Sequence, residues 1–168
     1  MAFDPVKVKQ VLNSFGESVV AKSKQNLSPR NATGNLANKI KFVAKVMPNS
    51  ISLNFDLGEY GQGIDQGIKG STDNQVTNDT PFQFNQIMPS RQMQRNLDQW
   101  ANTVGFTPFY KDRKWSIFRL GELILQRGIK PTYFFRDAYE EHFRTLDTEI
   151  MEAFGLDLDD FFELIFKK

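Results

Sequence analysis

The apolar residues of this 168-residue chain change their spacing near residue 40, and that change limits the folds open to it. Near the N-terminus they recur every three or four residues, which is the period of a helix with one apolar face. The positions that carry this stripe are Val8, Leu12, Phe15 and Val19. Between residues 40 and 57 the spacing falls to two, the period of a strand with one buried face. The chain therefore needs both helices and paired strands.

Two alternating runs in the segment 40–57 predict a β-hairpin. The apolar positions of the two runs are Ile40, Phe42, Ala44 and Val46, then Ile51, Leu53, Phe55 and Leu57. The sequence Pro48-Asn49-Ser50 between them has turn chemistry. We expect an α+β fold in which four to five helices pack on a small antiparallel sheet built around this hairpin.

Helical patterns surround the hairpin on both sides. Asp4 can cap the first helix, which should end before Pro29. A short turn of helix is expected at about 35–38, and further helices at about 91–104, with Ser90 as the cap, and at about 115–126. The longest helix should open at Thr132 and end at Gly155. A last helix, capped by Asp157, should follow.

The helical stripes and the hairpin predict which side chains form the core. The longest helix carries its expected stripe at Phe135, Tyr139, Phe143, Leu146, Ile150 and Phe154. The residues expected to be largely buried are Phe15, Phe42, Val46, Leu53, Phe55, Leu146 and Ile150.

The segment 58–70 holds five glycines, which predicts tight turns or close backbone approach. Gly61 and Gly63 match the start of the pattern G-x-G-x-x-G, but Gln66 stands at its last position. No apolar-periodic helix opens there, as a pyrophosphate site would need, so turn chemistry is the preferred interpretation. The polar stretch 71–80 that follows is expected to be a mobile loop.

Composition argues against catalysis and against a general phosphate-binding surface. The chain has 21 Lys and Arg against 20 Asp and Glu, and no cysteine. His142 is the only histidine, so the residues of a soft-metal site are missing. The pairs Glu140-Glu141 and Asp159-Asp160 point about 100° apart on a helix and do not converge. We therefore expect no catalytic residue, no cofactor, no metal, no secretory signal and no membrane span.

Three lysines keep a second function open. Lys39, Lys41 and Lys45 are expected on the polar side of the first strand, where they could contact phosphate groups. A protein that used this face would be a nucleic-acid-binding accessory protein. A solvated surface is the alternative for the same residues, and the balanced net charge favours it.

The order of several short motifs resembles the neck proteins of tailed bacteriophages, the head–tail connector or tail-completion family. After the first helix comes Ser28-Pro29-Arg30-Asn31-Ala32-Thr33-Gly34-Asn35-Leu36, with Ile40 behind it, leading into the hairpin. A segment with Tyr60, Ile64, Asp65 and Gly67 follows, and Pro131, Phe134 and Ala138 open the long helix. The resemblance covers roughly residues 5–70 and 128–154.

The resemblance implies a structural part in the virion rather than catalysis. Such proteins form homo-oligomeric rings, commonly of six or twelve copies, in the neck. Portal or adaptor proteins lie above the ring and tail proteins below it, and DNA passes through the lumen without sequence-specific contact. It implies a location in the neck of the virion, assembled in the host cytoplasm.

Two segments depart from the family pattern. We expect a single domain, 1–168, with an insertion at about 71–130 and a docking helix at about 156–168. The aromatic and methionine side chains of the insertion should supply subunit contacts: Phe82, Phe84, Met88, Met93, Phe106, Phe109 and Trp115. The interface residues we predict are Tyr60, Ile64, Gly67, Phe161, Phe162, Ile165 and Phe166.

Overall fold

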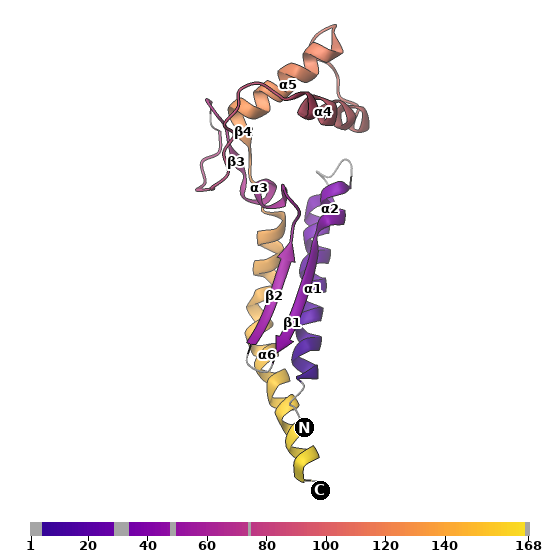
Figure 1. Ribbon diagram of the computed structural model, residues 1–168, viewed down its shortest axis with the longest axis vertical. Helices are drawn as coiled ribbons and strands as arrows, with labels where there is room; N and C mark the ends of the chain where they lie inside the picture. The colour runs from indigo at the N-terminus through magenta and orange to yellow at the C-terminus, as the bar shows by residue number, and fades with distance from the viewer. Residues whose placement is uncertain (1–4, 29–33, 48–49, 74, 167–168) are drawn as a thin grey trace. The chain divides into compact units, whose positions relative to one another are not determined.

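The computed structural model describes residues 5–28, 34–47, 50–73 and 75–166, and the predicted cap Asp4 lies outside this part. The fold is α+β, as expected (Figure 1). Its elements in chain order are α1 Val6–Leu27, α2 Asn35–Lys39, β1 Lys41–Met47, β2 Ser50–Asp56, α3 Gly61–Gln66, β3 Ile68–Lys69, α4 Arg91–Val104, α5 Arg113–Arg127, β4 Gly128–Ile129 and α6 Phe134–Phe166.

The chain divides into two compact units. The hairpin unit consists of Met1–Ser28, Ala37–Leu57 and Phe134–Lys168. The second unit consists of Pro29–Leu36 and Gly58–Tyr133. The second unit takes up more of the chain than the expected insertion at about 71–130, because it also includes Pro29–Leu36 and its main segment is Gly58–Tyr133.

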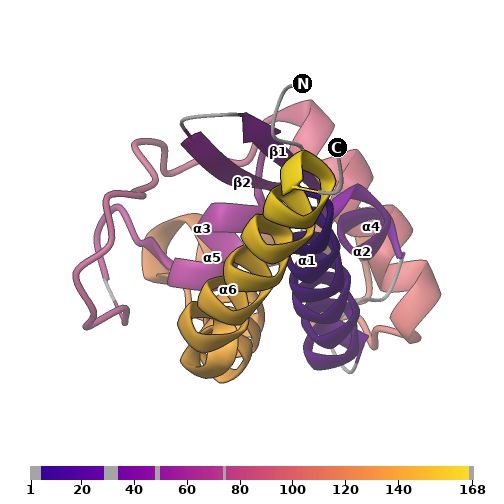
Figure 2. The same cartoon turned by 90° about the horizontal axis from the view of Figure 1, so that it is seen from below.

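In the hairpin unit α1 and α6 lie side by side in opposite directions (Figures 1 and 2). The predicted stripe of α1 is confirmed: Val8, Leu12, Phe15 and Val19 are buried. Polar contacts join the C-terminal half of α1 to the start of α6. The Asn26 side-chain amide donates to the Phe134 carbonyl at 3.1 Å, and Lys22 Nζ lies 3.1 Å from a carboxylate oxygen of Glu141.

The hairpin is confirmed, and β1 pairs with β2 in the antiparallel register Phe42↔Phe55 and Ala44↔Leu53. Both strands lie on the same side of the helix pair (Figure 2). Ala44 packs near Val8 and Leu12, while Leu53 and Phe55 pack against Phe15 and Leu146. The ring of Phe42 covers Gly16 of α1, where a Cβ would overlap it.

The residues predicted to form the core do face it, but most of them are less buried than expected. Phe15 and Leu146 are buried, whereas the other five residues expected to be largely buried are half-buried: Phe42, Val46, Leu53, Phe55 and Ile150. A sheet of two strands covers the helix pair from one side only, so its apolar face keeps contact with solvent at the rim.

The prediction that Gly155 ends the longest helix is wrong, because α6 continues to Phe166. Gly155 keeps a negative φ, and a Cβ there would meet nothing within 4 Å. Asp157 does not cap a new helix. Its carboxylate instead accepts hydrogen bonds from the backbone N–H groups of Lys7 and Val8 at 2.9 and 3.0 Å. This contact ties the part of α6 after the glycine to the start of α1.

The stripe predicted for α6 is also partly wrong. Phe143 and Phe154 are exposed, while Phe134, Ala138 and Ala153 are buried. The small side chains let α6 approach α1 closely, a use of alanine that a search for large apolar residues misses.

The second unit is held together by short strands and capped helices. The N–H of Met93 donates to the predicted cap Ser90 at 3.1 Å, and α4 ends at Gly105 in the left-handed conformation, as expected. The helix α5 begins earlier than expected, at Arg113, because Asp112 caps it. The pair β3–β4 is a second antiparallel sheet, which the sequence did not predict.

The polar segment 71–80 has no regular helix or strand among its described residues, but its backbone is tied to the end of α5. The N–H of Ser71 donates to the Leu125 carbonyl at 2.9 Å, and the N–H of Asp73 to the Gln126 carbonyl at 2.9 Å. Val76 and Thr80 are buried. The segment therefore packs on its own unit more closely than the expected mobile loop.

Candidate interaction surfaces

The three predicted interface residues around α3 differ in exposure. Tyr60, directly before α3, is 71% exposed and available to a partner. Ile64 is half-buried, and its carbonyl accepts hydrogen bonds from the N–H and the hydroxyl of Thr132. Gly67 is buried at a φ of 87°, and a Cβ there would lie 3.0 Å from the nitrogen of Pro131. Gly67 thus permits a close backbone approach inside its own unit.

The predicted interface residues at the end of α6 are described in part. Phe161 is half-buried, Phe162 is 49% exposed, and their ring centroids lie 6.2 Å apart. The side chains of Ile165 and Phe166 lie outside the described part of the structure. Exposed Phe162, with its half-buried neighbour, leaves this end of α6 able to contact another surface.

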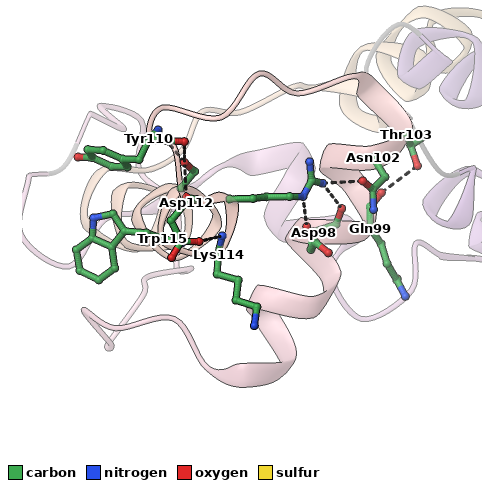
Figure 3. Close-up of polar contacts among 10 residues, drawn as sticks. Asp98, Gln99, Asn102, Thr103, Tyr110, Asp112, Lys114 and Trp115 are labelled. Carbon is green, nitrogen blue, oxygen red and sulfur yellow. Dashed lines mark hydrogen bonds and ion pairs between the residues drawn. The ribbon is translucent and has the colours of Figure 1, made fainter.

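A groove between α4 and the start of α5 is a surface that the sequence analysis missed. It encloses about 910 Å³ and is lined by Arg91, Gln94, Arg95, Asp98, Asp112, Arg113, Lys114 and Ile117. Figure 3 shows Asp98 and Asn102 on α4 opposite Asp112 and Lys114 at the start of α5. The spacing of Arg91, Arg95 and Asp98 along one helix face was the signal in the sequence, but the partner helix could not be known.

The two acids of this groove are already engaged. Asp98 pairs with Arg113 at 2.8 Å, and the Asp112 carboxylate accepts hydrogen bonds from the N–H groups of Lys114 and Trp115 at 2.8 and 3.4 Å (Figure 3). Arg91, Arg95 and Lys114 form no ion pair with any residue that the structure describes. The groove therefore carries positive charge able to bind an acidic ligand or partner.

The large side chains of the expected insertion are not all absorbed by the second unit. Met88 is 70% exposed, Trp115 is 54% exposed, and Phe109 is exposed as well. Phe82, Phe84, Met93 and Phe106 are half-buried. Such exposure of aromatic side chains is typical of surfaces that contact other proteins.

The three lysines of the alternative function lie on the hairpin unit. Lys41 and Lys45 are exposed on β1, whereas Lys39 is the last residue of α2 and not part of the strand. None of the three forms an ion pair with a described residue. They are free to contact phosphate, but the strand carries only two of them.

The remaining candidate residues lie on α3 and α6. The Gly61–Gly63 pattern lies inside the short helix α3 rather than in a loop between a strand and a helix, as a pyrophosphate site requires. His142 is half-buried on α6. Across the described residues, no three acidic or histidine side chains gather closely enough to hold a metal ion. Nor does any helix within these ranges have the length and apolarity needed to cross a membrane.

Comparison with models of protein families, with curated proteins and with solved structures found no match.

Proposed function

We propose that the protein is a structural subunit of the neck of a tailed bacteriophage. In this proposal it forms a ring that joins the portal of the DNA-filled head to the tail. The observation that carries the proposal is the hairpin unit, in which β1 and β2 lie along the antiparallel pair α1 and α6. This is the arrangement of hairpin and helices that the resemblance of the sequence motifs leads one to expect.

The exposed side chains give the proposal a second support. A ring needs two different patches on each copy, because its subunits meet head to tail. The chain offers candidate patches on both units, with Phe162 at the end of α6 and Met88 and Trp115 in the second unit. A near-neutral net charge of +1 also suits a ring through which DNA slides.

Binding to a portal ring tests the proposed function directly. The purified chain is mixed with portal rings isolated from several tailed phages, and the mixture is imaged by electron microscopy. The proposal predicts an added ring on the tail-facing side of one portal, coaxial with its channel. A chain that adds no density to any portal tested, under conditions in which it is folded, contradicts the proposal.

The alternative is a nucleic-acid-binding accessory protein, favoured by exposed Lys41 and Lys45 on β1. Each lysine–phosphate contact releases counterions. The logarithm of the binding constant would therefore fall with the logarithm of the salt concentration, with a slope of about −0.9 per contact. A duplex that binds at low salt, and is lost when both lysines are replaced by glutamate, would favour this alternative.

A further inference from the structure

The second half of α6 is strongly acidic. Residues 145–166 contain no lysine, arginine or histidine. Their seven acidic residues are Asp147, Glu149, Glu152, Asp157, Asp159, Asp160 and Glu163. This concentration contrasts with the balanced charge of the chain as a whole.

Only part of this negative charge is used within the hairpin unit. Asp157 is 5% exposed and caps α1, and Asp160 pairs with Lys7 at 2.7 Å. Four further acids are exposed and form no ion pair with any residue in the described ranges. They are Asp147, Glu149, Glu152 and Asp159.

An apolar stripe runs along the same part of α6. Met151, Phe154, Leu158 and Phe162 follow one another at spacings of three, four and four, so they share one side of the helix. Met151, Phe154 and Phe162 are exposed, and Leu158 is half-buried. At about 100° per residue, Asp147 continues this stripe toward the start of α6, whereas Glu149 lies on the opposite side of the helix. Glu152 and Asp159 lie together on one side of the stripe. An exposed apolar stripe with two carboxylates beside it is suited to a partner surface that is basic and has apolar neighbours.

The α4–α5 groove has these properties. Its cations Arg91, Arg95 and Lys114 have no ion-pair partner among the described residues, while its two acids are engaged. Arg91 and Arg95 lie one turn apart, so both face the groove from α4. Exposed Trp115 follows Lys114 in the sequence and provides apolar surface next to the groove.

We propose that the apolar stripe of α6 from one copy of the chain, with Glu152 and Asp159 beside it, docks in the α4–α5 groove of a second copy. This proposal rests on the proposed ring function and names the two patches through which the ring would form. The patches are different surfaces, so each copy can use its α6 toward one neighbour and its groove toward the other.

Charge complementarity favours a second copy over DNA as the occupant. Among the described residues, Glu152 and Asp159 beside the stripe form no ion pair, and Arg91, Arg95 and Lys114 in the groove form none either, so the two patches carry opposite charges that can pair. DNA would gain little from the rest of a surface whose net charge is +1. The apolar stripe on α6 would also stay uncovered if DNA filled the groove.

Two charge-reversed variants test the docking. The groove variant carries Arg91→Glu and Arg95→Glu, and the helix variant carries Glu152→Lys and Asp159→Lys. Each variant alone would place like charges together and should weaken self-association at least about tenfold. An equimolar mixture should recover it, because each variant then meets an opposite charge. The control Lys9→Glu with Lys45→Glu changes the charge as the groove variant does, on exposed residues of the hairpin unit, and should have no effect.

Sedimentation velocity gives the association, and circular dichroism checks that each variant is folded. If the unaltered chain forms rings that neither variant disturbs, the docking is wrong and the ring function stands. If the unaltered chain stays monomeric both alone and with a portal, the docking and the ring function are both wrong. A groove variant that assembles normally but loses binding to a DNA duplex would show the groove to be a nucleic-acid site, and would also overturn the docking.

Cross-linking tests whether α6 of one copy lies next to the groove of another copy. The chain has no cysteine, so Lys114→Cys and Asp159→Cys can be introduced on separate chains. Docking predicts that oxidation of the mixture yields mainly the mixed dimer. No mixed dimer, or equal yields of the mixed dimer and the two homodimers, would contradict the proposed contact.

Discussion

Asp157 is the residue whose structural role differs most from the role predicted from the sequence. Because Ser and Asp residues cap the helices that follow them, the sequence predicted that Asp157 begins a last helix. In the structure it caps α1, about 150 positions earlier in the chain. The sequence identified Asp157 as a helix cap but assigned it to the wrong helix, because a contact between distant parts of the chain cannot be read from a local pattern.

Replacement of Asp157 should therefore destabilise the hairpin unit. Asp157→Ala leaves two N–H groups at the start of α1 without their acceptor, which costs about 2 kcal/mol of unfolding free energy. Urea denaturation followed by circular dichroism measures the loss. The matched control Asp159→Ala removes an exposed acid two residues away and should change stability by less than about 0.5 kcal/mol. Equal effects of the two replacements would contradict the capping role.

Gly16 in α1 and Gly155 in α6 should respond to replacement by alanine in opposite directions. Gly155→Ala adds a Cβ to open space inside α6 and should stabilise the chain by about 0.5–1 kcal/mol. Gly16→Ala forces the ring of Phe42 to move, and overpacking of this kind costs about 1–3 kcal/mol. Thermal unfolding of both variants tests this. A loss of stability in Gly155→Ala would show that α6 breaks at residue 155.

At the scale of elements, the sequence predicted the hairpin and the helices α1, α4 and α5 well. Each of these has a clear signal: alternation in the hairpin, a stripe in α1, Ser90 before α4. The strands β3 and β4 have two residues each and leave no period to detect. α6 continues past Gly155 and places Asp157 against α1, a contact between distant parts of the chain that local helix signals could not reveal.

Truncation at two points separates folding from assembly. A chain that ends after Gly155 loses Asp157, so its free energy of unfolding should be about 2 kcal/mol lower than that of the full chain. A chain that ends after Asp160 keeps the cap and the ion pair with Lys7 but loses Phe161 and Phe162. It should fold cooperatively and associate more weakly. If both truncated chains keep full assembly, the end of α6 is not an interface.

For the whole molecule, the exposed surfaces could be predicted less completely than the fold. The exposed aromatic residues of the insertion could be named from composition. The α4–α5 groove could not, because it exists only once two helices are packed and Asp98 and Asp112 have engaged their partners. Which charges stay unpaired on a surface is a property of the folded chain.

Self-association should depend on salt if charged patches form the interface. The Debye length falls from about 10 Å at 0.1 M salt to about 3 Å at 1 M, which screens exposed pairs. Sedimentation between these two salt concentrations should show association weakened by about tenfold or more. Association that is unchanged or stronger at 1 M salt would instead assign the interface to apolar contacts alone.

The mass of the chain in solution shows whether it is a ring subunit, as proposed. Native mass spectrometry of the full chain, alone and mixed with a portal ring, measures the number of copies. A ring subunit should give a discrete assembly of six or twelve chains of 19.4 kDa each, alone or bound to the portal. A single chain of 19.4 kDa in both samples, at concentrations well above micromolar, would contradict it.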